Sequence, residues 1–328
     1  MGDGLLNKIE VIQVLRFLAA FSVMMVHLPV IGFGIWGVDI FFVISGFIMM
    51  YVTENNQKNF LVKRIIRIVP LYWILTLGVF SIAIFYPDLL NNTTANFEHL
   101  IKSLFFIPFD KNGSGHFPIL FLGWTLNFEI IFYILFSISL FFSKKNKFFL
   151  SSVLILLFLL FNYFLSNKNF ISASYFDFIF LEFIFGMTAF IIWKKFKDKI
   201  SLNLFGHLIF LLFLFSTIFI LNYFYTIRII SYGIPSFILL IYFLFFLNTK
   251  RFPKIFVTLG DASYCIYLLH PYIVQTFYKI FEIDKYGLIV QSFFTMIVVI
   301  LVCLISILIY KLIELPININ LRKKFVKQ

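Results

Sequence analysis

The stretch VLRFLAAFSVMMVH, residues 14–27, places an arginine and a histidine inside an otherwise apolar run. With its apolar neighbours it is long enough to be a membrane-spanning helix, since about twenty apolar residues cross the roughly 30 Å hydrocarbon layer. At about 100° per residue, Arg16 and His27 lie within about 20° of each other on the helix surface. Because ionisable groups in lipid are costly, we expect both side chains to face the protein interior.

The rest of the chain has the composition of an integral membrane protein. Of its 328 residues, 62% are hydrophobic and 13% charged, which is far outside the range of soluble domains. Lipid cannot satisfy an open backbone, so the spans should be helices. The apolar runs predict an all-α polytopic protein with ten transmembrane helices at about 9–30, 33–52, 68–86, 119–142, 148–165, 174–193, 203–221, 228–247, 255–278 and 288–313.

Lysine and arginine are distributed unevenly between the connecting segments. If the N-terminus is cytoplasmic, the cytoplasmic segments hold 20 of the 27 basic residues and the outer segments hold 6. The positive-inside rule therefore predicts cytoplasmic N- and C-termini. This topology explains the net charge of +12 without nucleic-acid binding. We expect one membrane domain over residues 1–328, with an extracytoplasmic loop at about 87–118.

His27 and two acidic residues form the first candidate site. Asp39 lies in the outer half of the second span at a depth near that of His27, and Glu129 lies near the middle of the fourth. A carboxylate beside an imidazole fixes its tautomer and makes it a better general base, so Asp39 or Glu129 would orient His27. In the alternative reading, His27 is a structural hydrogen bonder between helices. The carboxylates would then serve Arg16, a backbone amide or a polar cavity.

A cationic cluster follows the second span in KNFLVKRIIRIVP, residues 58–70. Arg64 and Arg67 are three residues apart and share a helical face, with Lys63 beside them. Guanidinium groups suit phosphate. Pro70 predicts the N-terminus of the third helix, where free amides favour an anion. The alternative is ordinary anchoring on anionic lipid.

The ninth span carries LGDASYCIYLLHPY, residues 259–272. Ser263, Tyr267 and His270 follow the i, i+4, i+7 pattern and share one face, with Tyr264 beside them. This pattern predicts a polar stripe that either lines a site or makes interhelical hydrogen bonds.

The remaining polar residues give weaker indications. Asp261 is a candidate N-cap or ligand contact, and Arg228 is expected at the outer surface. The sequence contains no His-x-x-x-His or Cys-x-x-Cys spacing, phosphate-binding glycine loop or nucleophile elbow, so we predict no metal and no serine triad. Cys265 and Cys303 both fall within predicted spans and indicate neither a disulfide nor a metal.

Seven motifs, taken in order along nearly the whole chain, resemble the acyltransferase-3 family of membrane acyltransferases. The motifs are RFLAAFSVMMVH (Arg16, His27), GVDIFFVISGF (Asp39, Ser45, Gly46), KRIIRIVPLYW (Arg64, Arg67, Pro70), GWTLNFEIIFY (Trp124, Glu129), RIISYGIPS (Arg228, Gly233, Pro235), LGDASYCIYLLHPY (Asp261 to His270) and IELP (Glu314, Pro316).

This resemblance implies a function. It implies ten helices, acetyl-CoA as the cytoplasmic donor, and an acceptor hydroxyl on a surface polysaccharide or its lipid-linked precursor, as in exopolysaccharide and O-antigen O-acetyltransferases. It also implies that His27 is catalytic and that Arg64 and Arg67 contact the donor. We assign the other candidates accordingly: catalytic, Asp39 and Glu129; donor-binding, Arg16 and Lys63; acceptor or pocket, Ser263, Tyr264, Tyr267, His270, Arg228 and Trp124.

The expected partners are an acyl-CoA, a glycan acceptor and the lipid bilayer of a bacterial cytoplasmic membrane, and a homo-oligomer is compatible with the sequence. Some relatives append an extracytoplasmic domain. We expect this chain to complete the reaction within its membrane domain or with a separate partner protein. The alternatives are a transporter or flippase for a glycan or small molecule, and an acyltransferase that uses another donor such as succinyl-CoA.

Overall fold

The computed structural model describes residues 9–90, 93–110, 117–196, 204–224, 227–247 and 251–326, and within them every regular element is helical. The predicted all-α class is therefore confirmed for this part of the chain. The helices are α1 (Glu10–Val26), α2 (Gly37–Val52), α3 (Phe60–Phe85), α4 (Phe97–Leu104), α5 (Trp124–Phe142), α6 (Lys147–Leu165), α7 (Phe170–Tyr175), α8 (Phe180–Phe196), α9 (Leu204–Phe224), α10 (Ile234–Tyr242), α11 (Lys254–Asp261), α12 (Ser263–Ile280), α13 (Leu288–Ile309) and α14 (Leu315–Phe325).

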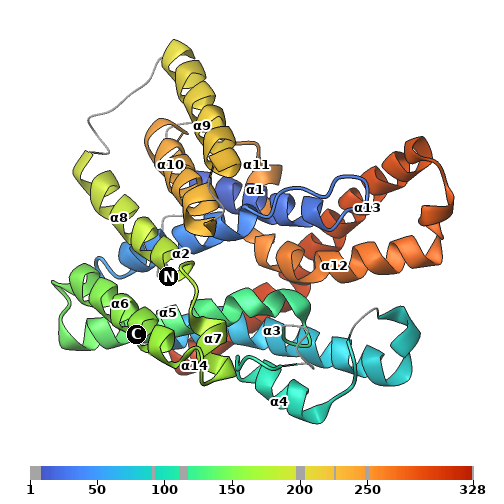
Figure 1. The fold of residues 1–328 in the computed structure, drawn as a ribbon, viewed down its shortest axis with the longest axis horizontal. Coiled ribbons are helices and arrows are strands. Elements are labelled where there is room, and N and C mark those ends of the chain that lie inside the picture. The colour runs from blue at the N-terminus through green and yellow to red at the C-terminus, as the bar shows by residue number, and fades with distance from the viewer. Residues whose placement is uncertain are drawn as a thin grey trace.

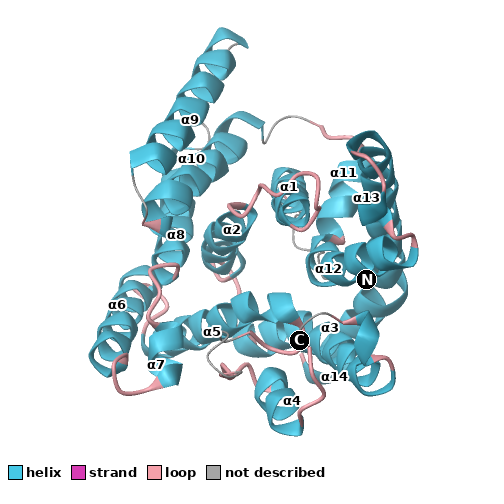
Figure 2. Cartoon of the chain, turned by 45° about the vertical axis from the view of Figure 1, so that its right-hand side comes forward, coloured by secondary structure: helices cyan, strands magenta, loops and turns pink. Residues whose placement is uncertain are grey.

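The first two helices lie in the middle of the bundle. α1 packs against α2, α11 and α12, and α2 packs against α8 and α10. Figure 1 shows α1 and α2 between α8, α9 and α10 on one side and α12 and α13 on the other. In Figure 2 the other helices form a ring around them. The residues predicted on α1 and α2 are therefore held inside the protein.

Two glycines set the close contact between α2 and α8. A Cβ added to Gly46 would lie 2.1 Å from the carbonyl oxygen of Phe183, and one added to Gly186 would lie 1.9 Å from that of Val43. Small residues let membrane helices approach backbone to backbone and gain van der Waals contact. The small residues Ser45 and Gly46 predict close helix packing at this place, and the contact confirms it at Gly46.

Six helical runs are long and apolar enough to cross a membrane: Phe60–Phe85, Phe121–Phe142, Lys147–Leu165, Phe170–Phe196, Ile229–Leu247 and Leu288–Phe325. Helices also occupy the other predicted ranges, as α1, α2, α9, and α11 with α12. The fold is that of a multi-pass membrane protein. The number ten and the cytoplasmic position of both termini stay predictions.

The predicted start of the third helix is wrong. α3 begins at Phe60, two turns before the predicted residue 68, after Asn59 in the left-handed conformation (φ 55°). Pro70 therefore lies inside α3 and no helix N-terminus faces an anion there. The apolar residues between Lys63, Arg64 and Arg67 extend the helix toward its N-terminus. A proline is tolerated inside a membrane helix because neighbouring groups can hydrogen-bond to the backbone carbonyl that it leaves unpaired.

The ninth and tenth spans also differ from prediction. The ninth is divided at Ala262 into α11 and α12, and Gly260 packs directly on the backbone of Gln13 in α1. The tenth continues beyond residue 313, because a π-helical turn, Tyr310–Glu314, connects α13 to α14. The charged C-terminal run, predicted as a cytoplasmic segment, thus becomes a helix that packs against α3.

The long loop at 87–118 folds onto the ends of the helices. Tyr72 donates a hydrogen bond to the carbonyl of Ser103 at 3.0 Å, and Trp73 donates to that of Leu104 at 2.8 Å. Tyr175 donates to the carbonyl of Phe106 at 2.9 Å. The described part of the loop therefore packs against α3 and α7. The segment DKNGSGHFP, residues 110–118, predicts a turn at Gly113 and Gly115, and both glycines lie outside the described residues.

Candidate active site

A cavity of about 590 Å³ lies between α1, α2, α3, α5, α12 and α14. Along α2 its lining extends from Val38 to Val52, which corresponds to about 21 Å at the helical rise. That length is most of the thickness of the hydrocarbon layer. Below, the "arginine end" denotes the part at Arg64 and Arg322, and the "tyrosine end" the part at Thr125 and Tyr267.

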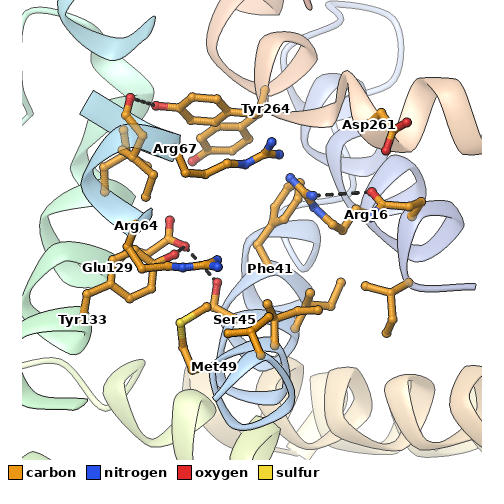
Figure 3. A pocket seen from close by; sticks show the side chains of 18 of the residues that line it. Arg16, Phe41, Ser45, Met49, Arg64, Arg67, Glu129, Tyr133, Asp261 and Tyr264 are labelled. Carbon is orange, nitrogen blue, oxygen red and sulfur yellow. Dashed lines mark hydrogen bonds between the residues drawn. The ribbon is translucent and has the colours of Figure 1, made fainter. Parts of the chain in front are cut away.

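Basic residues outnumber acidic ones in the lining. Among the described lining residues the arginines are Arg16, Arg64, Arg67 and Arg322, and the carboxylates are Glu129 and Asp261. Figure 3 shows Arg16, Arg64 and Arg67 directed into the same space from two different helices. The cavity therefore has an excess of positive charge, which favours an anionic ligand. The predicted donor residue Lys63 lies on the same helix but is not among the lining residues.

The arginines differ in how far the protein already neutralises them. Arg67 Nη1 lies 3.2 Å from Oε1 of the buried Glu314. Arg16 Nη1 donates a hydrogen bond to the uncharged side chain of Gln13 at 3.4 Å. Neither Arg16 nor Arg64 forms an ion pair with a carboxylate in the described part of the chain. Arg16 and Arg64 are thus the cations best able to bind an incoming anion.

Glu129 is a polar anchor in the middle of the cavity wall. Its Oε1 accepts hydrogen bonds from Ser45, at 2.9 Å, and from Tyr133 (Figure 3). Ser45 binds the carboxylate from α2, whereas Tyr133 binds it from the next turn of α5, the helix that carries Glu129. The expectation that Glu129 meets a polar cavity is confirmed, but no contact with His27 accompanies it.

The tyrosine end is closed by hydrogen bonds between helices. Tyr267 and Thr125 share a hydrogen bond of 2.9 Å between their hydroxyls, and the ring of Phe41 lies edge-on to Tyr267 with centroids 5.6 Å apart. Tyr264 also lines the cavity and donates to the carbonyl of Ile68 at 2.9 Å. Both predicted tyrosines are therefore cavity residues.

His27 lies just beyond the tyrosine end, at the C-terminal end of α1. Its Nδ1 is 2.9 Å from the carbonyl oxygen of Val23 and 3.1 Å from Nε2 of His270. The His270 ring in turn lies 6.3 Å from that of Tyr267, centroid to centroid. A line of contacts therefore joins the cavity to His27. The predicted orientation of His27 by Asp39 or Glu129 is wrong, because a histidine and a carbonyl occupy that place.

Asp39 belongs to a different buried cluster. Both of its carboxylate oxygens accept hydrogen bonds from Arg228, at 3.0 and 2.7 Å, and its side chain is fully buried. Glu182, also fully buried, lies beside this pair against Gly233. The guanidinium of Arg228 occupies both oxygens of Asp39, so the suggested pairing of Asp39 with Arg16 is wrong. The side chain of Arg228 is 27% exposed, and its expected position at the outer surface stays a prediction.

Of the remaining candidates, Ser263 and Trp124 lie outside the cavity lining and Asp261 lies in it. Ser263 is fully buried in α12 and Trp124 packs edge-on against Phe128, so neither lines the cavity. Asp261 ends α11 and lines the cavity, while Ala262 occupies the N-cap of α12. The N-cap role considered for Asp261 is therefore wrong and the ligand-facing role remains.

Sequence reasoning missed lining residues near the C-terminus. Arg322 and Tyr310 line the cavity because the chain continues as α14 beneath α3. The sequence carried no helical signal for α14, because its apolar residues recur every second residue, at Leu315, Ile317, Ile319 and Leu321. In the described residues, no cluster of three or more metal-ligating side chains is found.

Comparison with known proteins gives consistent results. Residues 9–310 match the family described as "Acyltransferase domain" (Acyl_transf_3). "Exopolysaccharide production protein ExoZ" of Rhizobium meliloti (strain 1021) is 37% identical over 166 residues, which span 49% of this chain and about half, 52%, of that protein. "Putative acetyltransferase ORF330" of Acidianus two-tailed virus is 28% identical over 280 residues, or 78% of this chain and 80% of the relative. No solved structure is significantly similar to the chain.

Proposed function

The chain belongs to the acyltransferase-3 family and is an acyltransferase, and we propose that it moves an acetyl group from cytoplasmic acetyl-CoA to a hydroxyl of a surface polysaccharide or its lipid-linked precursor. The observation that carries this proposal is the cavity that begins among arginines and ends one ring away from the His27–His270 pair. Because the chain belongs to a family of acyltransferases, the alternative function as a transporter is dropped.

The arginine end fits the phosphates of coenzyme A. Arg64 and Arg322 are lining residues with no carboxylate partner in the described chain, and arginine binds phosphate through charge-assisted, often bidentate hydrogen bonds. An acyl-CoA also carries a long flexible arm between its phosphates and its thioester. A cavity that follows α2 for about 21 Å suits such an extended ligand better than a compact one.

The chemistry then falls to His27. In direct transfer, its ring takes the proton of the acceptor hydroxyl as the new ester C–O bond forms, while the thioester C–S bond breaks and coenzyme A leaves as the thiolate. In the two-step route, the ring nitrogen itself first takes the acetyl group and then passes it to the hydroxyl. Both routes need the thioester carbonyl to reach His27 past Tyr267. Both release one coenzyme A for each ester formed.

The acceptor would approach on the opposite side of His27 from the cavity. The ring of Phe121 lies 6.3 Å from that of His27 and the ring of Phe117 lies 4.6 Å from Phe121, centroid to centroid, and both are exposed. These exposed aromatic faces can support a sugar ring. The name of the relative from Rhizobium meliloti, which refers to exopolysaccharide production, supports a glycan as the acceptor class.

A comparison of cells with and without the gene tests this proposal. Surface glycan from the two strains would be compared for ester-linked acetyl and succinyl groups by NMR and mass spectrometry. We expect acetyl esters that disappear with the gene and return with a plasmid copy. Glycans with identical ester content in both strains would contradict a glycan acceptor, and a loss of succinyl esters alone would contradict the acetyl donor.

A further inference from the structure

We propose that His270 is a positioning residue that holds His27 in the tautomer protonated on Nδ1, leaving Nε2 bare to accept the proton or the acyl group. This inference rests on the proposed role of His27 in the reaction. The sequence predicts that Asp39 or Glu129 orients His27, and we assign this role to the imidazole of His270 instead.

The proton position on His270 follows from its own contacts. Its Nδ1 lies 2.9 Å from the carbonyl oxygen of Ile266, one turn earlier on α12. A carbonyl oxygen only accepts hydrogen bonds, so Nδ1 must carry a proton. The side chain is fully buried, and a charged imidazole there would be costly. His270 is therefore neutral, and its Nε2 presents a lone pair.

That lone pair and a backbone carbonyl together favour one tautomer of His27. The Nδ1 of His27 faces two acceptors, His270 Nε2 at 3.1 Å and the Val23 carbonyl at 2.9 Å. Only a protonated Nδ1 satisfies either of them. The reverse arrangement would set the bare Nδ1 of each histidine against a carbonyl lone pair less than 3 Å away. No described residue hydrogen-bonds to the Nε2 of His27.

The consequence is chemical. The side chain of a free neutral histidine prefers its proton on Nε2, so the protein reverses the ordinary preference at this site. When Nε2 of His27 takes a proton or an acetyl group, the ring becomes cationic and its Nδ1–H strengthens its bonds to His270 and Val23. The two rings lie 4.9 Å apart, centroid to centroid, at 63°, which aims His270 Nε2 at the edge of its neighbour. This is the role that a carboxylate plays in better-known catalytic histidines.

Nitrogen-15 NMR of the full-length protein in nanodiscs, labelled on its five histidines, tests the tautomer directly. Signals from His27 and His270 are assigned by their absence in His27→Ala and His270→Phe. We expect His27 to be protonated on Nδ1 and bare on Nε2. The preference should weaken in His270→Phe, where the Val23 carbonyl is the acceptor that remains, and be kept in His270→Gln, whose side-chain oxygen can still accept the hydrogen bond. An unchanged tautomer ratio in His270→Phe would show that Val23 alone sets the proton position and would contradict the role of His270. A wild-type His27 protonated on Nε2 would overturn the inference.

Steady-state kinetics provide the second test. His270→Phe should lower kcat by about 10²-fold, the lower range of a positioned general base, and leave KM for the acyl donor unchanged. His270→Gln should recover part of the loss. His207→Phe is the matched control, because His207 makes a comparable bond of 3.0 Å to Tyr242 on helices that do not line the cavity. An unchanged kcat in His270→Phe would contradict the proposal.

The two tests separate this inference from the proposed function. The NMR experiment needs no substrate, so it decides the tautomer even if no acetyl transfer is found. Should His270→Phe fail to fold, the wild-type spectrum still decides the tautomer, and His270→Ala replaces it as the variant that removes the second acceptor.

Discussion

Arg67 Nη1 lies 3.2 Å from Glu314 Oε1, whereas Arg64, one turn earlier on the same helix, makes no ion pair with any carboxylate in the described ranges. The two arginines look equivalent in the sequence but have different electrostatic surroundings. Glu314 is buried and also accepts a hydrogen bond from the Cys265 thiol at 3.1 Å. Arg67 therefore connects α3 to the π-helical turn Tyr310–Glu314, and Arg64 is the freer of the two for an anion.

Replacing these two arginines should have different effects. Arg64→Ala should weaken coenzyme A binding by about tenfold or more, since one hydrogen bond to a charged group is lost, and leave thermal stability close to wild type. Arg67→Ala should lower the free energy of unfolding by about 3–5 kcal/mol, because it leaves Glu314 buried without its partner. Calorimetric titration and thermal unfolding in detergent measure the two quantities.

A second substitution serves as the control for this difference. Adding Glu314→Gln to Arg67→Ala should restore much of the lost stability, because no unpaired charge then remains. Equal stability of Arg64→Ala and Arg67→Ala, with equal coenzyme A affinities, would show that the Arg67–Glu314 pair has no such structural role.

Arg322 provides a prediction outside the motifs recognised in the sequence. Arg322→Ala should weaken coenzyme A binding by about tenfold, since its guanidinium lines the arginine end. Lys323 is the next residue and does not line the cavity, so Lys323→Ala should bind coenzyme A with wild-type affinity. If both variants weakened binding to the same extent, general surface charge would explain the effect and α14 would have no part in the site.

Narrowing the tyrosine end should separate binding from transfer. Val38 is buried at that end of the lining, and Val38→Phe places a ring where the thioester would pass. We expect acetyl transfer to fall by about 10²-fold, because the carbonyl can no longer reach His27 in a reactive geometry, while coenzyme A binding is retained. Val38→Ala, which widens the same place, is the control. Loss of binding and transfer in parallel would contradict the proposed path.

The contact between α2 and α8 should tolerate no side chain. Gly46→Ala and Gly186→Ala should each lower the free energy of unfolding by about 1–3 kcal/mol, because the new methyl group meets backbone carbonyls. Gly78→Ala is the control, since a Cβ there meets nothing within 4 Å. That variant should gain about 0.5–1 kcal/mol from helix propensity. Thermal unfolding of the three variants decides the matter, and equal changes would rule out a close helix contact.

The sequence predicted the parts of this protein that depend on short-range patterns. Hydropathy placed a helix in each of the ten ranges, and the i, i+4, i+7 pattern correctly predicted that Tyr267 and His270 share a face. Pairing between distant segments could not be predicted in this way. Asp39 was equally compatible with Arg16 and with several other partners, and its pairing with Arg228, 189 residues away, depends on how α2 packs against the π-helical turn Ile229–Gly233.

Two further misses have local causes. Pro70 was interpreted as a helix start because proline usually is one at a membrane surface, yet the helix had begun at Phe60. Arg322 was counted only as a cytoplasmic charge, because a basic C-terminal run normally reports topology. In both places the helix extends past the apolar run of the sequence, so hydropathy could not locate the start of α3 or the end of α14.

The most direct test of the central claim is a measurement of free thiol released from acetyl-CoA by the purified protein in lipid vesicles, with glycan from cells that lack the gene as the acceptor. We predict that the wild type releases one thiol for each ester formed on the glycan. His27→Ala should lose at least about 10² in rate, since a group that acts directly on the reacting atoms is removed, while it binds coenzyme A normally. Thiol release and ester formation at the wild-type rate in His27→Ala would contradict the account.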